Sequence, residues 1–474
     1  MMDSPAAKTN GSNRNSLSDQ KCLVMGGGLS GLASVKLLTR LGAKVTISDK
    51  KPIAAKDAFW LSSVGADIID EAQAYSIIER FRLVVVSPGV PFEHPLLRLA
   101  RSYGLEIIGE IELAFRNQNL DVLAVTGSNG KTTTAALTGY ILNRLGVETF
   151  VGGNIGCPFA ELCVMSIDKK IGDMKAAVLE ISSFQLETIA QFHAKAAAFL
   201  NLTPDHLDRH GDMQEYLRVK SRIFNRQNQS DLAVINLDDP NVQGLGAPAG
   251  RFGFSTKKRP EFGGYVEQGL MKIVDGKSLL GVAAWSDFNL IGVHNQENVM
   301  AAVGLCLGLD IDPQRALLAA RDFVASDHRL QQVGVYDGVR YIDDSKGTNV
   351  GAVARALESF DGPVILIAGG RDKGLDFSYL APYVSKHVKK LIIMGESRAK
   401  IKRSLASVAS IAEVSSMSEA VSVAKSEAEI GDVVLLSPAC ASFDMFKDYK
   451  ERGDVFASEV RRQAGEEASF KDLK

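Results

Sequence analysis

The sequence predicts an α/β protein of three domains, each built on a mostly parallel sheet covered by helices. Short apolar segments of strand length alternate with longer segments of helical periodicity, a pattern typical of parallel sheets. Two glycine-rich turns, near Gly26 and Gly127, each follow a strand-like segment and precede a helical one. Because one sheet seldom carries two such turns, they indicate two domains. A further strand–helix block from Ser326 indicates a third.

Length and composition agree with this fold class. The chain has 474 residues, which corresponds to about three domains of roughly 150 residues each. Hydrophobic residues make up 46% and charged residues 23%, values that exclude a mainly disordered chain or a coiled coil. The net charge of −2 excludes a global positive field for nucleic acid or anionic lipid. No apolar run approaches the ~20 residues that a membrane span needs.

We expect the chain to divide into a flexible tail over 1–20 and domains over 21–110, 111–325 and 326–474. The tail is polar and has no apolar central region, which excludes a secretory signal. The five cysteines include no CxxC pair. They therefore predict neither a disulfide framework nor a zinc site, and they fit a reducing cytoplasm.

Each predicted element follows from a local pattern. Short apolar runs predict strands at 21–25, 44–48, 83–86, 121–126, 176–180, 196–201, 363–368, 391–394 and 433–436. Apolar residues at helical spacing predict helices over 30–41 and from 131 to about 145. Residues 332–343 alternate around Asp337-Gly338, a hairpin turn signal. The segment 241–276, rich in Gly, Lys and Pro, is expected to hold loops and short strands.

The first glycine turn, residues 26–31, fits G-x-G-x-x-G and indicates a Rossmann-like domain. Its backbone can approach a pyrophosphate, which then lies on the helix N-terminus. The motif leaves the ligand open: NAD, FAD or another nucleotide diphosphate, such as a UDP-sugar. Asp49 ends the next strand and is either a binding carboxylate or a solvated strand end. Residues 87–90 follow a later strand and are expected to add a second loop at the same edge.

The second glycine turn, TGSNGKTT at 126–133, predicts a shortened P-loop, because Val125 stands where the strict pattern has glycine. Its glycines leave room for phosphate oxygens against backbone N–H groups. Lys131 supplies a positive charge to the phosphates, and Thr132 offers a hydroxyl to Mg²⁺. The central domain is therefore expected to bind a nucleoside triphosphate. We find no guanine-reading motif of the kind that a switch GTPase requires.

Titratable residues follow two later strands of the central domain. Glu180 ends one of them, and a carboxylate beside a P-loop is a natural second ligand for Mg²⁺. The motif NLTPDHLDRH at 201–210 places His206 where a metal or a substrate could lie. A capped polar loop would have the same composition.

Lys220 lies on the apolar face of a helical segment over 213–224. A buried lysine is costly unless it is paired or neutral, and burial lowers its pKa. A neutral amine can react with CO₂ to give a carbamate, which replaces a cation by a metal-binding carboxylate. The pattern alone favours the alternative, a stem that extends its charged end to water.

Eight motifs in order resemble the Mur ligase family, and the resemblance covers nearly all of the chain from about Lys21. They are TGSNGKTTT, GGNIG at 152–156, LEISSFQLE at 179–187, NLTPDHLDRH, HNQEN at 294–298, DHRL at 327–330, DDSKGTN at 343–349 and LLSPACASFDMFKDYKERG at 435–453. The last motif, with Ser442 and Phe443, favours a member that adds D-glutamate.

The resemblance implies a cytoplasmic, monomeric bacterial ligase with ATP and two Mg²⁺. Such an enzyme joins D-glutamate to UDP-N-acetylmuramoyl-L-alanine through an acyl phosphate. A CO₂-derived carbamate on Lys220 would join the metal ligands, and this reverses the expectation from the helical pattern. Whether His206 or a nearby carboxylate takes the amine proton is left open.

The resemblance also assigns roles to matched positions. The UDP substrate would contact Gly28, Leu29, Ser30, Asp49, Lys51, Gly89 and Asn154. ATP would contact Gly127, Ser128, Asn129, Gly130, Lys131, Thr132, Thr133, Asn295, Asn298, Arg329, Asp344 and Lys346. D-Glutamate would contact Thr348, Lys373, Ser442, Phe443 and Tyr449. The metal ions would be held by Thr132, Glu180, His206 and Lys220, and the catalytic residues would be Lys131, His206 and Lys220.

Two positions depart from the family pattern: Tyr449 replaces a familiar Phe, and Arg371 stands where an acid is expected. The sequence leaves three other functions to be weighed. One is another Mur ligase or a folate polyglutamate ligase. Another is an NAD-linked oxidoreductase, which would leave the P-loop without a role. The last is a P-loop switch, which predicts nucleotide turnover independent of any amino acid.

Overall fold

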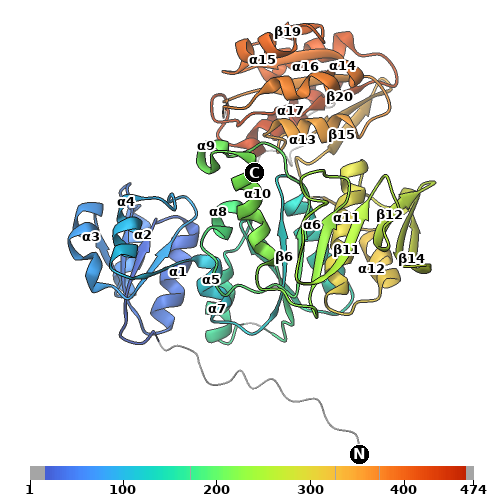
Figure 1. The fold of residues 1–474 in the computed structure, drawn as a ribbon. Coiled ribbons are helices and arrows are strands. Elements are labelled where there is room, and N and C mark those ends of the chain that lie inside the picture. The colour runs from blue at the N-terminus through green and yellow to red at the C-terminus, as the bar shows by residue number, and fades with distance from the viewer. Residues whose placement is uncertain (1–16, 171, 326, 373, 466–474) are drawn as a thin grey trace, which may run out of the picture.

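Three sheets follow one another along the chain in the computed structural model, which describes residues 17–170, 172–325, 327–372 and 374–465. The first domain lies beside the central one, and the third domain lies above the central one in the view of Figure 1. The predicted α/β class with three domains is confirmed. None of the helices within these residues has the length and apolar character that a membrane-spanning helix requires.

The first domain is a five-stranded parallel sheet in the order β3-β2-β1-β4-β5. Its elements are β1 (Lys21–Met25), α1 (Leu29–Arg40), β2 (Lys44–Ser48), α2 (Ala55–Ser63), β3 (Asp67–Ile69), α3 (Glu71–Ile77), η1 (Ile78–Arg80), β4 (Leu83–Val86), α4 (Pro95–Ser102) and β5 (Glu106–Gly109). Strand β4 is buried throughout and β1 except at its first residue, as expected for parallel strands covered on both faces. The strand order reverses between β1 and β4, where ligands bind in folds of this kind.

The central domain has nine strands in the order β14-β13-β12-β11-β10-β9-β6-β8-β7. Its elements are α5 (Glu110–Phe115), β6 (Asp121–Thr126), α6 (Lys131–Arg144), β7 (Thr149–Gly153), α7 (Phe159–Ile167), β8 (Ala176–Glu180), α8 (Ser183–Leu186), β9 (Ala196–Phe199), α9 (Leu207–His210), α10 (Met213–Ser221), η2 (Arg222–Phe224), β10 (Leu232–Asn236), β11 (Gly250–Ser255), β12 (Phe262–Glu267), β13 (Leu270–Asp275), β14 (Ser278–Ala284), η3 (Trp285–Asp287), α11 (Val293–Leu307) and α12 (Pro313–Ala320). The short strands expected within 241–276 are β11, β12 and β13. Strands β13 and β14 extend the sheet as an antiparallel edge.

The third domain has six strands in the order β15-β16-β20-β17-β18-β19. Its elements are β15 (Gln331–Tyr336), β16 (Val339–Asp343), α13 (Val350–Leu357), β17 (Val364–Gly369), η4 (Phe377–Leu380), α14 (Ala381–His387), β18 (Val388–Met394), α15 (Arg398–Leu405), β19 (Ile411–Glu413), α16 (Met417–Glu427), β20 (Val433–Leu436) and α17 (Tyr449–Ala464). The hairpin predicted around Asp337-Gly338 is confirmed as the antiparallel pair β15–β16. The other paired strands of this sheet are parallel.

Helix α1 of the first domain packs against α7 of the central domain, and buried residues of both domains form one hydrophobic cluster. Two ion pairs border this contact: Lys36 Nζ lies 2.6 Å from Glu161 Oε1, and Arg40 Nε lies 2.9 Å from Asp168 Oδ1. The shared core fixes the first domain against the central one.

Side-chain caps define where several helices begin, but the P-loop helix is different. Asn349 accepts a hydrogen bond from Ala352 N at the start of α13, and Asp448 accepts two at the start of α17. Helix α6 begins after Gly130, which has φ = 84° and no side chain to accept a bond. The first N–H groups of α6 are therefore available to an anion such as a phosphate.

Candidate active site

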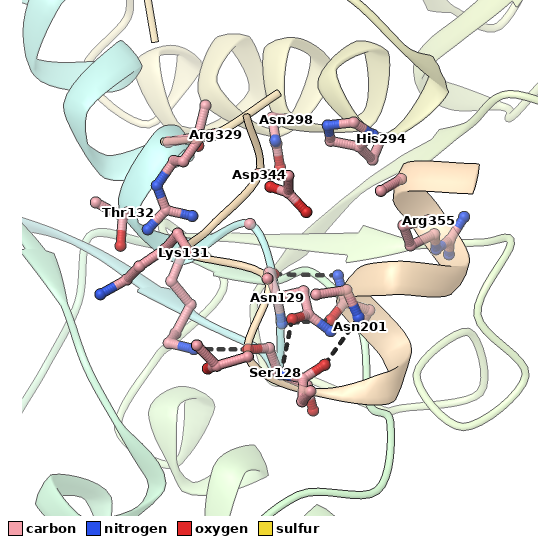
Figure 2. A pocket seen from close by; sticks show the side chains of 18 of the residues that line it. Ser128, Asn129, Lys131, Thr132, Asn201, His294, Asn298, Arg329, Asp344 and Arg355 are labelled. Atoms are coloured by element: carbon pink, nitrogen blue, oxygen red, sulfur yellow. Dashed lines mark hydrogen bonds between the residues drawn. The ribbon is translucent and has the colours of Figure 1, made fainter. Parts of the chain in front are cut away.

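A cleft lies where the P-loop, α11 and α13 meet, so residues of the central and third domains line it together. Figure 2 shows its side chains, with Arg329, Asp344 and Arg355 contributed by the third domain. The P-loop stands at the carboxyl end of β6, the edge at which open α/β sheets bind ligands.

The P-loop adopts a compact conformation that requires its glycines. A Cβ atom at Gly130 would lie 2.5 Å from Asn298 Oδ1, and one at Gly127 would lie 3.1 Å from Leu200 Cβ. Lys131 folds back over the loop, and its Nζ donates to the carbonyls of Gly127 and Ser128 at 2.9 Å each. Figure 2 shows Lys131 beside Ser128. Burial lowers the pKa of Lys131, while the charges of Glu180 and Asp205 oppose that shift.

Glu180 stands at the end of β8, buried to 2% exposure, and both of its oxygens accept hydrogen bonds. Thr132 Oγ1 donates to Oε2 at 2.7 Å, and Asn154 Nδ2 donates to Oε1 at 2.8 Å. The structure thus brings together three predicted site residues that lie far apart in the sequence. Their hydroxyl, carboxylate and amide oxygens are the hard donors that Mg²⁺ prefers.

Lys220 is 1% exposed, so the expectation of a stem that extends to water is wrong. Its Nζ donates to Gly127 O at 2.9 Å and to Thr126 Oγ1 at 3.4 Å, and it faces the ring of Tyr216 at 4.9 Å. Burial, and then the charge of Lys131, lower its pKa well below the ordinary value. The amine therefore lies directly beneath the P-loop in an environment that favours its neutral form.

His206 has the left-handed backbone conformation, with φ = 55°, immediately before α9. Its ring packs edge-on against Phe184 at 4.9 Å, and its Nε2 lies 3.6 Å from Asp205 Oδ2. The residue is exposed and lines the same cleft as Glu180 and Lys131. Within the described residues, no three His, Cys, Asp or Glu side chains gather as a metal site of their own. A metal held by Glu180 and His206 would need the Thr132 hydroxyl, Lys220 or phosphate oxygens as further ligands.

The asparagines of α11 are held by side-chain hydrogen bonds. Asn295 Nδ2 donates to Ile291 O at 2.7 Å, and Asn298 Nδ2 donates to Asn295 Oδ1 at 3.0 Å. Thr134 Oγ1 of the P-loop helix donates to Asn298 Oδ1 at 3.1 Å. The Thr134 bond connects α6 to α11.

Three predicted residues of the third domain also lie at the cleft: Arg329, Asp344 and Lys346. Burial lowers the pKa of Arg329 and raises that of Asp344 to about 7, although the charge of each opposes the shift of the other. Ser437 Oγ donates to Asp344 Oδ2 at 2.7 Å, and Lys346 Nζ lies 3.7 Å from the centre of the Tyr449 ring. These contacts orient both side chains at the edge of the cleft.

Helix α13 docks the third domain onto the central one. At its start, Asn349 Nδ2 donates to Asn129 Oδ1 of the P-loop at 3.1 Å. Near its end, Arg355 Nη1 lies 3.5 Å from Glu297 Oε1 of α11. Burial raises the pKa of Glu297 to about 7 against the opposing charge of Arg355. Both ends of α13 therefore contact residues that line the cleft.

Three family models match the chain in succession. They are the MurD-like N-terminal domain over residues 20–109, the Mur ligase middle domain over 125–306 and the glutamate ligase domain over 328–440. The chain belongs to the Mur ligase family.

Relatives of this Mur ligase match it over most of its length. A protein of Syntrophus aciditrophicus named UDP-N-acetylmuramoylalanine–D-glutamate ligase is 41% identical over 455 residues, which cover 94% of this chain and 98% of that protein. A protein of the same name from Geotalea daltonii is 42% identical over 452 residues, with the same two coverages.

Solved structures share the fold. A pseudomurein peptide ligase type C from Methanothermus fervidus matches with a TM-score of 0.60 and 19% identity, over 94% of this chain and all of that one. The UDP-N-acetylmuramate–alanine ligase MurC from Thermotoga maritima matches with a TM-score of 0.57 and 19% identity, over 94% and 99%. At these identities the structures support the three-domain architecture.

In this Mur ligase, the turn predicted to bind the UDP substrate is organised by Asp49. Its Oδ2 accepts from Gly27 N at 2.6 Å and its Oδ1 accepts from Lys51 N at 2.7 Å, so Asp49 is more than a solvated strand end. Gly28, Leu29 and Gly89 are exposed, and Ser30 is partly exposed, at the same edge of the first sheet. Leu29 is 76% exposed although it is apolar. This edge is separate from the P-loop cleft.

The residues predicted to bind D-glutamate are less concentrated. Thr348 lines the cleft, whereas Ser442, Phe443 and Tyr449 are absent from its described lining. Ser442 is 2% exposed, and its carbonyl accepts from Met445 N and Phe446 N. Phe443 is 62% exposed, and Lys373 lies outside the described residues. Arg371, the unexpected cation, lies 3.4 Å from Glu396 Oε2 at the surface.

Sequence reasoning missed several residues of this Mur ligase's site. Glu297 lies within the HNQEN motif but was given no role, and Arg355 lies in none of the motifs. Their proximity depends on docking of the third domain, which no local pattern indicates. Asn349 could have been found, because an asparagine before an apolar helical segment is a typical cap. Tyr216 is a buried core residue, and its ring also contacts Lys220 and His210.

We expect His210 to make the stability of the central domain depend on pH. Its ring stacks on Tyr216 at 5.0 Å, and its Nε2 lies 2.9 Å from Ser183 Oγ. Burial, followed by the charges of Arg209 and Lys220, lowers its pKa to about 4. In the unfolded chain, the His210 imidazole becomes protonated near pH 6.5. The stability from neutral His210 is therefore present above pH 6.5 and is lost as pH falls toward 4.

Between pH 7.5 and 4.5 the free energy of unfolding should fall by about 2–3 kcal/mol because of His210. Urea unfolding followed by Trp285 fluorescence in a Trp60→Phe background reports the central domain. His210→Phe keeps a stacked ring without a titrating group. The difference in free energy of unfolding between the parent and this variant should therefore become smaller at low pH. A difference that stays constant would contradict the assignment.

Proposed function

We propose that this Mur ligase joins D-glutamate to UDP-N-acetylmuramoyl-L-alanine with conversion of ATP to ADP and phosphate. The observation that carries the proposal is the match of nearly the whole chain, at about 41% identity, to proteins that bear this name. The P-loop cleft between two domains supports it, because it offers a phosphate site next to titratable side chains. The product would serve peptidoglycan precursor synthesis in the cytoplasm, and thereby cell wall growth, cell shape and division.

ATP would lie with its phosphates on the P-loop and its base near α11. Backbone N–H groups from residues 127–133 and the charge of Lys131 would hold the phosphates. Asn295 and Asn298 would lie near the adenine, and Arg329, Asp344 and Lys346 would complete the site from the third domain. The contact of Asn349 with Asn129 favours this arrangement, because it brings the third domain directly onto the P-loop.

Magnesium ions would be held by Thr132, Glu180, His206 and a carbamate on Lys220. Bound Mg²⁺ would offset the charge of the phosphates and the substrate carboxylate. The buried Lys220 amine supports the carbamate, because its environment favours the neutral form that reacts with CO₂. We propose two such ions.

The reaction would proceed in two steps within the closed cleft. A carboxylate oxygen of the UDP substrate attacks the γ-phosphorus, and the bond to the β–γ bridging oxygen breaks, which gives an acyl phosphate and ADP. The amine of D-glutamate then attacks the acyl carbon, phosphate leaves and the amine loses a proton. Lys131 stabilises the charge that develops on the transferred phosphoryl group. The docked third domain excludes water, which would otherwise hydrolyse the acyl phosphate.

The two substrates would approach from opposite domains. UDP would lie on the first domain at Gly28, Leu29, Ser30, Asp49, Lys51 and Gly89, with Asn154 on the path toward Glu180. D-Glutamate would bind to the third domain at Thr348, Lys373, Ser442, Phe443 and Tyr449.

We also propose that the domain boundaries lie near residues 110 and 325 and that the enzyme is a monomer.

Phosphate release with UDP-N-acetylmuramoyl-L-alanine, measured with and without D-glutamate, tests the proposed function. The expected result is release that requires both substrates and ATP. Turnover without an amino acid would indicate a P-loop switch. Preference for another amino acid would indicate a different member of the family, and nicotinamide binding would favour an oxidoreductase.

Lys373→Ala should raise the KM for D-glutamate far more than the KM for ATP. A lost hydrogen bond to a charged group costs roughly 1.5–3 kcal/mol, or about 10- to 150-fold. Initial rates over a matrix of both substrates measure the two effects. Equal effects on both constants, or L-glutamate acting as well as D-glutamate, would contradict this acceptor pocket.

A further inference from the structure

Arg209 of α9 joins the central domain to the first domain at the loop formed by residues 87–90. Its Nη1 donates to Pro88 O at 2.8 Å, and its Nη2 donates to Val90 O at 3.2 Å. These carbonyls flank Gly89, an exposed residue of the predicted UDP site. One side chain of the central domain thus holds both sides of a first-domain loop.

The Arg209 guanidinium is itself held rigidly within the central domain. It forms an ion pair with both oxygens of Glu187, through Nε to Oε1 at 3.2 Å and through Nη2 to Oε2. Its plane lies over the Phe184 ring at 4.1 Å. The side chains of Arg209 and Glu187 are 16% and 9% exposed, so solvent screens the pair little. Such a fork has one orientation, which a flexible lysine could not reproduce.

Further contacts connect Arg209 to the first glycine turn in one direction and to His206 in the other. On one side, Ser87 Oγ donates to Gly26 O at 3.0 Å, and a Cβ atom at Gly26 would lie 2.8 Å from Ser87 Cβ. The loop therefore packs directly on the first glycine turn. On the other side, the Phe184 ring under the Arg209 guanidinium also packs against His206, which lies three residues before Arg209 in the chain.

We propose that Arg209 is a positioning residue that sets the UDP-binding loop at a fixed place relative to His206 and the P-loop. The UDP moiety binds to the first domain, whereas the carboxylate at the other end of the substrate must reach the phosphates on the central domain. A fixed separation between the two sites delivers the carboxylate in line with the γ-phosphate. This inference rests on the proposed function, since it assumes a substrate that spans both domains.

The test compares Arg209→Lys and Arg209→Ala with Arg222→Lys as the matched control. Arg222 also bridges two carbonyls, those of Glu187 and Ile189, at 2.8 and 2.6 Å, but both belong to its own domain. We measure kcat, the KM for each substrate, the Kd for UDP alone and amide exchange of Val90. Arg209→Lys is the main variant because it retains the charge and folds more readily than Arg209→Ala.

We expect both Arg209 variants to lower kcat by about 10- to 100-fold, since small misplacements of reacting groups have effects of this size. The Kd for UDP should change less than about threefold, because its contacts lie within the first domain. Exchange of the Val90 amide should be faster than in wild type. Arg222→Lys should lower the melting temperature but leave kcat and Val90 exchange near their wild-type values.

Two results would overturn the inference. One is a kcat for Arg209→Lys equal to that of Arg222→Lys, which would mean that Arg209 serves stability only. The other is a loss of UDP affinity as large as the loss in kcat, which would place Arg209 inside the UDP site. If the wild-type enzyme failed to turn over the UDP substrate, the proposed function would fall. Val90 exchange in the two lysine variants would still decide whether Arg209 holds the loop.

Discussion

Lys131→Ala is expected to lower the ligation rate by about 10³-fold or more, while the affinity for the UDP substrate stays within about twofold. Removing one preorganised donor to a developing charge costs about 10²–10³ in kcat, and here the donor is also a full positive charge. Its Nζ now donates to the carbonyls of Gly127 and Ser128, so it is already at the loop that would hold the phosphates. The UDP substrate would bind to another domain.

Single-turnover phosphate release and isothermal titration with UDP-N-acetylmuramoyl-L-alanine measure the two quantities separately. Lys195→Ala is a suitable control, because Lys195 also belongs to the central domain but contacts Ser230 O and Asp231 away from the cleft. It should retain most of the activity. If Lys131→Ala weakened binding of the UDP substrate as much as turnover, the assignment of two separate sites would be wrong.

The second large effect is expected at Lys220, where Ala and Arg variants should both be nearly inactive but folded. The buried amine has two hydrogen-bond acceptors within 3.4 Å, Gly127 O and Thr126 Oγ1, and Lys131 disfavours a second positive charge nearby. As a carbamate, the residue would gain metal bonds that offset its burial. Arg keeps the positive charge and cannot react with CO₂, so it should not substitute for Lys.

Acetate separates the carbamate from a structural role for Lys220. At high concentration it should occupy the space vacated in Lys220→Ala and restore part of the activity, but it should not affect Lys220→Arg. Melting temperatures establish that both variants fold, and a mass gain of one CO₂ on the wild-type protein would be direct support. An active Arg variant would show that a positive charge suffices, and the carbamate would then be excluded.

Local patterns in the sequence were sufficient for several strands, for the starts of two helices and for the P-loop. Strands β1, β2, β4, β6, β8 and β20 have the predicted bounds. All of these except β2 are buried on both faces along almost their whole length, and such strands are nearly continuous apolar runs between turn residues. Helices α1 and α6 start within one residue of the prediction, at glycine turns. Strand β18 begins at Val388, three residues before the predicted start, because polar residues at the edge of the core still pair with β17.

The environment of individual side chains was less accessible to sequence reasoning. Lys220 was expected to reach water on its helical pattern alone, but the P-loop covers the end of its side chain. Asp49 was ambiguous until its bonds to Gly27 N and Lys51 N were known. In both cases a deciding partner belongs to a distant turn, Gly127 for Lys220 and Gly27 for Asp49, and a helical or strand period contains no information about it.

The sequence by itself determined the three-domain α/β fold, the phosphate-binding loop and the residue types of the site, since each depends on neighbours a few positions away. The tertiary structure decided which of these residues meet. Glu180 contacts Thr132 and Asn154 because three parallel strands end at one edge, and α13 reaches both Asn129 and Glu297 because the third domain docks there. Arg209 contacts a loop more than 100 residues away for the same reason. Such contacts depend on packing between whole domains, which no local spacing encodes.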